Sequence, residues 1–130
     1  MKKEAFNSAK VVSYKQFQVN HAVKVGNTIY VSGQVAWDKD GNVIGEGNLE
    51  AQSVQALENL KSILAEAGAT LNDVVKLNVF WAESVDWEKT IEVWKGYFTT
   101  EPFPAVTATI TKLAYPELLV EFDAIAVVSD

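Results

Sequence analysis

Apolar residues recur at helical spacing between positions 49 and 67. The residues of this stripe are Val54, Leu57, Leu60 and Leu64. Such spacing places side chains along one side of an α-helix, the side that packs against a core. Asn48 stands where a helix N-cap is expected, and Gly68 stands where a glycine commonly ends a helix. The pattern predicts a helix from about Leu49 to Ala67.

A second stripe has the same spacing and is mostly aromatic: Trp87, Ile91, Trp94 and Phe98. It predicts another amphipathic helix, with Ser84 as its N-cap. Asp86 falls in the first turn, where a carboxylate meets the positive end of the helix dipole. Pro102 and Pro104 then break the pattern, because proline has no backbone N–H with which to continue a helix.

Shorter apolar runs and alternating patterns predict strands at 10–17, 22–25, 28–37, 74–82, 105–113 and 118–128. Gly26 and Asn27 form a two-residue signal for a hairpin turn between two of these strands. Gly33 interrupts the run at 28–37. An isolated glycine inside a strand indicates a bulge or a close approach of the backbone to another group.

A chain of 130 residues has the length of one domain, and we expect a single domain over residues 1–130. The simplest arrangement is an α+β fold in which both helices pack on one face of a mixed sheet. Several apolar residues cannot all face the helices: Tyr30, Val35, Phe80, Ile110, Phe122 and Ile125. A sheet that is apolar on both faces needs a second cover, so we expect a homo-oligomer in which another copy supplies it.

The stretch LLVEFDAIAVV, Leu118–Val128, carries two carboxylates inside an otherwise apolar strand. Because side chains alternate between faces, Glu121 and Asp123 share one face. One interpretation places both in solvent, or pairs them with Lys112 or another lysine across the sheet. The other interpretation places a carboxylate in a partly apolar cleft. There, desolvation raises its pKa, so that it can polarise a water molecule or move a proton.

Composition narrows the possible classes of function. The chain is 48% hydrophobic, has no cysteine and has a net charge of −6, with 11 lysines and no arginine. This balance argues against nucleic acid as the main partner, because phosphate binding needs a positive surface. It also removes the side chain that grips a carboxylate with a planar fork of donors. No apolar run has the length of a membrane span and no secretory leader is visible, so we expect a cytoplasmic protein.

Few motifs of known chemistry are present. His21 is the sole histidine, so a nucleophilic triad has little support, and we expect His21 to be structural or exposed to solvent. Metal-ligand spacing and glycine-rich nucleotide loops are absent from the sequence, so we expect neither a metal nor a cofactor. The stretch YVSGQ, residues 30–34, is either a locally satisfied bulge or a backbone edge that a ligand approaches at Gly33.

Four blocks of sequence together resemble the Rid family (reactive intermediate deaminase, also called YjgF): VGNTIYVSGQVAWD, QALENLKSILAEAGATLNDVVKLNVFWAES, FPAVTAT and LLVEFDAIAVV. The resemblance spans about residues 19–128. It implies a chorismate-mutase-like α+β fold of the bacillus type, assembled as a homotrimer with its sheets inside and its helices outside. It also implies ligand clefts between subunits and hydrolytic release of ammonia from imines and enamines such as 2-aminoacrylate.

The same resemblance implies roles for individual residues. Glu121 matches the glutamate that positions the attacking water. The other matched positions line the family's cleft: Ser32, Gly33, Gln34, Val106, Thr107, Ala108, Val19 and Ile91. Val106 stands where an arginine of the family grips the substrate carboxylate. Three further positions depart from the family pattern, which has cysteine, tyrosine and asparagine there: Ala108, Val19 and Ile91.

Valine at position 106 offers neither charge nor hydrogen-bond donor to a carboxylate, so we expect weak or no activity on imines that carry one. The leading hypothesis is a trimer with a more apolar cleft that binds or hydrolyses a small neutral or apolar ligand, with Glu121 as acid and base. The alternative is a trimer that binds small molecules or acts as a chaperone without catalysis. Endoribonuclease or translation-inhibitor activity, a name also attached to this family, ranks third because the chain is acidic and lacks arginine.

Overall fold

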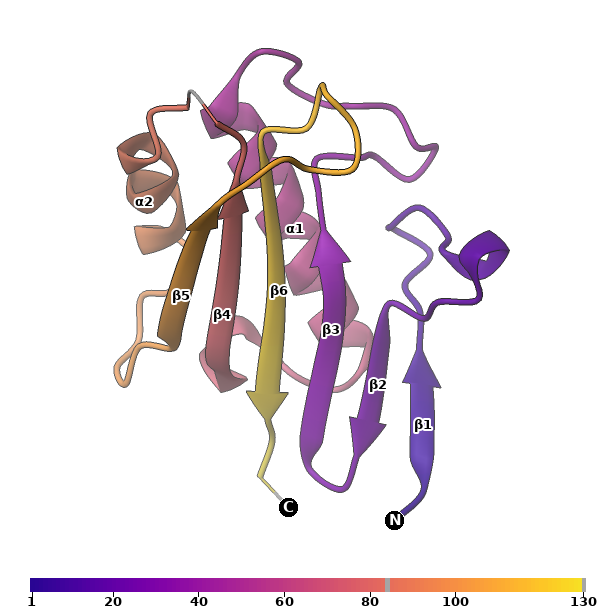
Figure 1. The fold of residues 1–130 in the computed structure, drawn as a ribbon. Helices are drawn as coiled ribbons and strands as arrows, with labels where there is room; N and C mark the ends of the chain where they lie inside the picture. Colours follow the sequence, from indigo (N-terminus) through magenta and orange to yellow (C-terminus); the bar gives the residue numbers. More distant parts are fainter. Residues whose placement is uncertain (84, 130) are drawn as a thin grey trace.

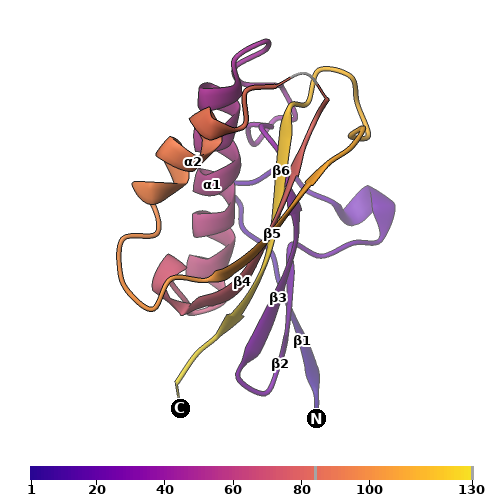
Figure 2. The ribbon, with the colours of Figure 1, turned by 60° about the vertical axis from the view of Figure 1, so that its left-hand side comes forward.

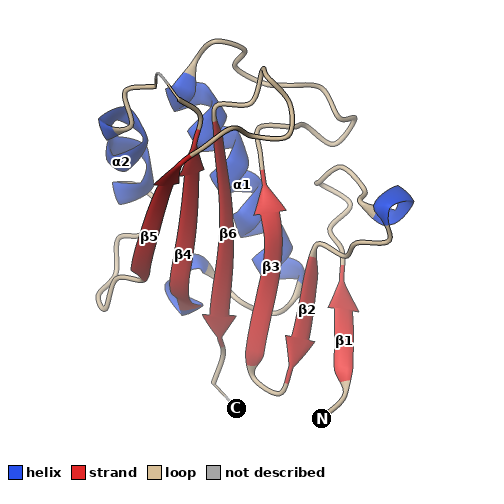
Figure 3. Ribbon diagram, in the orientation of Figure 1, coloured by secondary structure: helices blue, strands red, loops and turns tan. Residues whose placement is uncertain are grey.

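Six strands form one sheet in the computed structural model, which describes residues 1–83 and 85–129 (Figure 1, Figure 3). Their bounds are β1 Lys3–Phe6, β2 Ala22–Val25, β3 Thr28–Gln34, β4 Val74–Trp81, β5 Ala105–Ile110 and β6 Val120–Val127. The spatial order is β1-β2-β3-β6-β4-β5, so the last strand of the chain lies inside the sheet. Neighbouring strands are antiparallel except β4 and β5, which are parallel. The predicted mixed sheet is confirmed.

The two α-helices, α1 Leu49–Glu66 and α2 Glu88–Lys95, pack on the same face of this sheet (Figure 2). Two short 3-10 helices, η1 Lys15–Phe17 and η2 Leu71–Asp73, connect strands. Figure 2 shows η1 on the opposite side of the sheet from α1 and α2. The α+β class, with both α-helices on one face, is therefore confirmed. No helix in the described part of the chain has both the length and the apolar character of a transmembrane segment.

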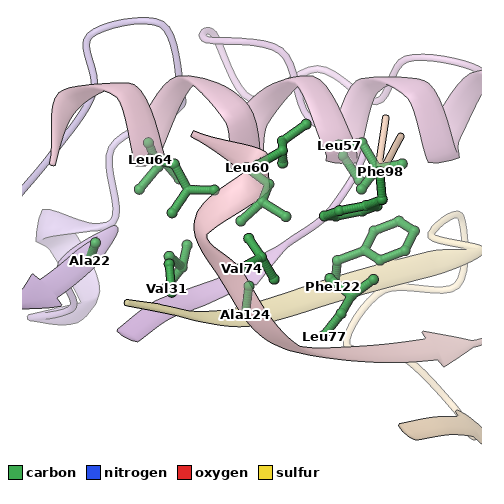
Figure 4. Close-up of a cluster of buried hydrophobic side chains, with 14 of the residues drawn as sticks. Ala22, Val31, Leu57, Leu60, Leu64, Val74, Leu77, Phe98, Phe122 and Ala124 are labelled. Atoms are coloured by element: carbon green, nitrogen blue, oxygen red, sulfur yellow. The ribbon is translucent and has the colours of Figure 1, made fainter. Parts of the chain in front are cut away.

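Helix α1 begins and ends where the sequence predicts. The Asn48 side chain accepts a hydrogen bond from the Ala51 backbone N–H at 3.0 Å, and Gly68 follows the helix with a φ of +82°. The predicted stripe is only partly right, because Val54 is 41% exposed. The side that packs on the sheet is built by Ala56, Leu57, Leu60, Ile63 and Leu64. Figure 4 shows three of these leucines pointing from α1 toward the sheet.

Helix α2 is shorter than predicted, and Phe98 lies beyond its last residue. The predicted cap, Ser84, lies outside the described residues. The helix is tied to the rest of the fold through the buried hydroxyl of Thr90. Trp81 of β4 donates its indole N–H to this hydroxyl at 2.9 Å, and Ser53 of α1 lies 3.0 Å from it. One hydroxyl thus joins α1, α2 and the sheet.

The predicted strand at 10–17 is wrong. The first strand is β1, and residues 10–17 form a loop that contains η1. His21, only 1% exposed, organises this region: its Nδ1 accepts from the Ser8 backbone N–H at 3.0 Å, and its Nε2 lies 2.7 Å from the Val12 carbonyl oxygen. Both contacts are satisfied at once only by a neutral ring with its proton on Nε2. The structural role expected for His21 is confirmed.

The faces of the sheet differ as the alternation along β6 predicts. The buried side chains of β6 that pack under the helices are Val120, Phe122, Ala124 and Ala126. The opposite face, called the open face below, carries Tyr30, Phe80, Glu121, Asp123 and Ile125. Of the six apolar residues expected to divide between the faces, Val35 and Phe122 are buried. Ile110 lies on the helix side of edge strand β5, since it pairs in register with buried Trp81.

Candidate functional site

Gly33 and Glu121 lie against each other where β3 meets β6. The ladder passes from the pair Val31–Ala124 to the pair Gln34–Phe122, so residues 32 and 33 form a bulge. A Cβ built on Gly33 would collide with Oε2 of Glu121 and lie 2.9 Å from its Cδ. The predicted bulge and close approach are both confirmed. The group that approaches the Gly33 backbone within the chain is the carboxylate of Glu121.

Glu121 is half-buried on the open face, and its pKa is raised above the ordinary range of a glutamic acid. Burial is the larger cause, because it penalises the charged form, and the nearby charge of Asp123 adds to it. Among the described residues, the ion pairs are Lys89–Glu50 and Lys95–Glu92, so no lysine pairs with Glu121. The interpretation that Lys112 neutralises this carboxylate is therefore wrong.

Asp123 has a different environment from Glu121. The Asn78 side-chain amide donates to Oδ1 of Asp123 at 2.7 Å, across the register pair between β4 and β6. Glu121 and Asp123, which share one face of β6, therefore have different roles. Asp123 is bound within the fold, and Glu121 is the group with the raised pKa.

Tyr14 is a site residue that the sequence did not indicate. Its hydroxyl donates to the Gly33 carbonyl oxygen at 2.9 Å. Burial and the charge of Glu121 raise the pKa of Tyr14 to about 12, against an opposing hydrogen bond from Gln34. The hydroxyl is thus protonated at neutral pH and remains a donor. Residues 10–17 were expected to form a strand, and an edge strand there would not fold over Gly33. Tyr14 was therefore not among the predicted site residues.

The two polar residues of the Ser-Gly-Gln stretch are engaged differently. The Ser32 hydroxyl donates to the Asn20 carbonyl oxygen at 2.7 Å, and the Ser32 backbone N–H donates to the His21 carbonyl oxygen at 2.9 Å. Gln34 has no exposed surface and donates through Nε2 to the Ser32 carbonyl oxygen at 3.2 Å. Within the described residues, Oε1 of Gln34 is the buried side-chain atom left without a hydrogen-bond partner.

Val106 lies on the other side of the sheet from Glu121. It pairs in register with buried Leu77, whereas Glu121 pairs with Phe80 on the open face. Val106 borders a cavity of about 520 Å³ between β5 and α2, lined by Leu77, Trp94, Lys95, Phe98, Thr99, Phe103, Pro104 and Val106. Within one chain, therefore, Val106 does not contact Glu121. The expectation that both line one cleft between subunits stays a prediction.

The remaining predicted positions are scattered. Thr107 faces the open side and accepts a hydrogen bond from Nζ of Lys76 at 2.6 Å, while Ala108 follows Val106 on the helix side. Val19 is exposed in the loop after η1, and Ile91 is half-buried on α2 without lining the cavity at Val106. In the described residues, no group of three or more histidines, aspartates or glutamates is arranged to hold a metal ion.

Sequence comparison places this chain among known proteins. The family model described as Endoribonuclease L-PSP matches residues 10–128. A RutC family protein of Pyrococcus abyssi is 39% identical over 107 residues, which cover 82% of this chain and 84% of that protein. A 2-iminobutanoate/2-iminopropanoate deaminase of Dermatophagoides farinae is 34% identical over 110 residues, 84% of each chain.

Comparison with solved structures agrees. RidA from the Antarctic bacterium Psychrobacter superposes with a TM-score of 0.86 at 32% identity, over 96% of this chain and 99% of that one. A protein of the Rid family from Yersinia pestis superposes with a TM-score of 0.90 at 25% identity, over 98% and 100%. The match of the family model over most of the chain, the relatives and the fold agree: the chain belongs to the Endoribonuclease L-PSP family, the family of the RutC and Rid proteins.

Proposed function

We propose that this protein is a hydrolytic deaminase of imines and enamines that lack a carboxylate, acting in clefts between the subunits of a homotrimer. The observation that carries the proposal is the Glu121 carboxyl group. It lies on the Gly33 backbone, its pKa is raised, and no lysine of the described residues pairs with it. Raising the pKa of a carboxyl group brings it closer to neutral pH, which suits a group that must both give and take a proton.

The proposed reaction uses Glu121 twice. The protonated carboxyl gives its proton to the imine nitrogen, which makes the imine carbon more electrophilic. The resulting carboxylate takes a proton from a water molecule as the water oxygen bonds to that carbon and the C=N π electrons move to nitrogen. The carbinolamine then transfers its hydroxyl proton to nitrogen by way of Glu121, the C–N bond breaks, and a carbonyl and ammonia leave. Imine and water are consumed, and Glu121 returns to its starting state.

The positions of the two halves of the site support assembly from several copies. Glu121, Gly33 and Tyr14 lie together on the open side of the sheet, while Val106 and its cavity lie between the sheet and α2. A cleft that contains both halves needs a second chain. The open face also presents Tyr30, half exposed, beside Ile125, an apolar surface of the kind that a second copy covers.

The absence of arginine supports the choice of substrate. The cavity beside Val106 is walled by Trp94, Phe98 and Phe103, and the chain has no guanidinium with which to bind a carboxylate. A carboxylate placed there would lose its hydration and meet only Lys95, a cation that already pairs with Glu92 at 3.5 Å and lacks the planar fork of arginine. An uncharged imine carries no such penalty. The Dermatophagoides farinae relative is named for imines of 2-oxo acids. We propose that the substrate of this chain differs from these imines because it lacks their carboxylate.

A pair of imines tests the proposal: the uncharged imine of acetophenone and 2-iminopropanoate, both generated in situ, with ammonia release as the readout. We expect wild-type protein to act on the first with at least about tenfold higher kcat/KM than on the second, and Glu121→Gln to act on neither. Val106→Arg should raise activity on 2-iminopropanoate, and Val106→Lys should raise it less, because lysine lacks the planar fork. Rapid hydrolysis of 2-iminopropanoate by wild-type protein, or full activity in Glu121→Gln, contradicts the proposal.

Endoribonuclease activity is a second candidate because the matching family model carries that description. The net charge of −6 and the lack of arginine oppose it, since RNA binding depends on neutralising phosphates. RNA cleavage that stays constant through successive purification steps would support this second candidate. Cleavage that is lost on purification would dispose of it. Ligand binding without turnover, retained in Glu121→Gln, would point instead to the non-enzymatic trimer.

A further inference from the structure

Four aromatic rings from three segments of the chain surround a small cleft, called the aromatic cleft here. Its rings are those of Tyr14, Phe17, Trp37 and Tyr115, and Glu117 completes its lining together with Val12, Ser13, Gln16, Gly41 and Val43. The segments meet at the end of the sheet where β3 ends and β6 begins (Figure 1). The volume of about 290 Å³ lies just below the usual range for ligand pockets, which suits only a small ligand.

Contacts within the fold fix the orientation of three of the four rings. Trp37 and Tyr115 meet edge to face, with ring centroids 5.5 Å apart and planes at 62°. Tyr14 is fixed at both ends, by its hydroxyl on the Gly33 carbonyl oxygen and by an edge contact to buried His21 at 5.0 Å and 87°. Phe17 is 57% exposed in the single chain.

The charge of the cleft has one sign. Glu117 is the only acidic or basic residue in its lining, and within the described residues its carboxylate forms no ion pair. Its backbone is fixed, because Nε2 of Gln52 donates to the Glu117 carbonyl oxygen at 2.9 Å. An unpaired carboxylate at an aromatic wall attracts a cation in two ways, by its own charge and by the negative faces of the rings.

We propose that the aromatic cleft binds a small organic cation of the methylated or quaternary ammonium class. Aromatic faces suit such a cation because it is large and weakly hydrated and, when fully methylated, carries no N–H donors that demand oxygen ligands. A divalent metal ion fits poorly, since it requires several oxygen or nitrogen ligands and the cleft offers one carboxylate. This inference does not depend on the proposed deaminase function. Tyr14 belongs to both sites, but its hydroxyl is turned to Gly33 while its ring lines the cleft.

Binding of choline to the full-length protein tests the proposal, measured by titration calorimetry and by the NMR signals of the tryptophan indole N–H groups. Dimethylbutanol, in which carbon replaces the charged nitrogen of choline, is the matched uncharged ligand. We expect choline to bind at least about fivefold more tightly than dimethylbutanol and to shift the Trp37 signal. Glu117→Gln and Trp37→Leu should each weaken choline binding about fivefold or more.

Two control variants make the result specific. Glu46→Gln removes an exposed carboxylate outside the cleft, and Trp87→Leu removes an exposed tryptophan outside it. Both should bind choline as wild-type protein does. Equal affinity for choline and dimethylbutanol, binding that survives Glu117→Gln and Trp37→Leu in folded protein, or no binding of choline at tens of millimolar would each overturn the proposal. Thermal unfolding of every variant shows which ones remain folded. If Trp37→Leu does not fold, Trp37→Phe is used in its place.

Discussion

At Gly33 the absence of a side chain leaves room for the Glu121 carboxyl group against the main chain. Gly33→Ala places a methyl group on that position, so Glu121 must move. Because a displacement of about 1 Å in a catalytic group can cost on the order of a hundredfold in rate, we expect a loss of that order in kcat. Gly96→Ala is the matched control, because its new Cβ would meet the Val93 carbonyl oxygen at an ordinary 3.4 Å. Full activity in Gly33→Ala would show that the close approach has no catalytic role.

The raised pKa of Glu121 also makes stability depend on pH. The folded protein holds this proton more tightly than the unfolded chain does, so the associated stabilisation is present in acid and is lost as pH rises through the raised pKa. Glu121→Gln cannot ionise. We therefore expect the free energy of unfolding of this variant, relative to wild type, to increase from acid to neutral pH.

Urea unfolding at a fixed protein concentration and at several pH values measures this dependence. Glu46→Gln serves as the control, because Glu46 is exposed in the loop before α1. A difference between Glu121→Gln and wild type that stays constant with pH would mean that Glu121 has an ordinary pKa. A difference that falls with rising pH would mean that a cation reaches Glu121 in the assembled protein.

At the scale of elements, local signals predicted most of the fold. Asn48 and Gly68 marked both ends of α1, Gly26 marked the hairpin, and alternation along β6 correctly divided its two faces. The failures come from contacts between distant residues. His21 binds the backbone at Ser8 and Val12, which holds this segment out of the sheet, and no pattern within the segment reveals that contact. The parallel pairing of β4 and β5 is likewise a consequence of the chain crossing through α2.

The junction of α1, α2 and β4 yields a prediction about stability. Thr90→Val keeps the shape of the buried side chain but leaves the Trp81 indole N–H and the Ser53 hydroxyl without their partner. Burying unpaired polar groups costs about 1–3 kcal/mol each, so we expect the free energy of unfolding to fall by at least about 1 kcal/mol. Thr100→Val, at an exposed position, is the control. Urea unfolding measures both, and equal stabilities would mean that the hydrogen bonds at Thr90 contribute nothing.

At the scale of the molecule, the candidate site was only half predictable. The sequence and its resemblance singled out Gly33 and Glu121, which are in contact. They could not place Val106, because the face on which an edge-strand residue lies depends on its register with β4. They also missed Tyr14, whose position depends on the loop that His21 organises. Which side chains meet across a loop, or between paired strands, depends on the tertiary fold. No spacing pattern in the sequence predicts these contacts.

In the proposed assembly, Glu121 of one copy works beside the Val106 cavity of another. Mixing two inactive variants tests it: Glu121→Gln, which lacks the acid, and Val106→Trp, which fills the cavity. If trimers reassemble at random from equal amounts, about a quarter of their clefts contain an intact Glu121 facing an intact cavity. We therefore predict that unfolding and refolding the mixture restores about a quarter of the wild-type rate of ammonia release from an uncharged imine. Activity no higher than the mean of the two variants refolded separately would contradict the account.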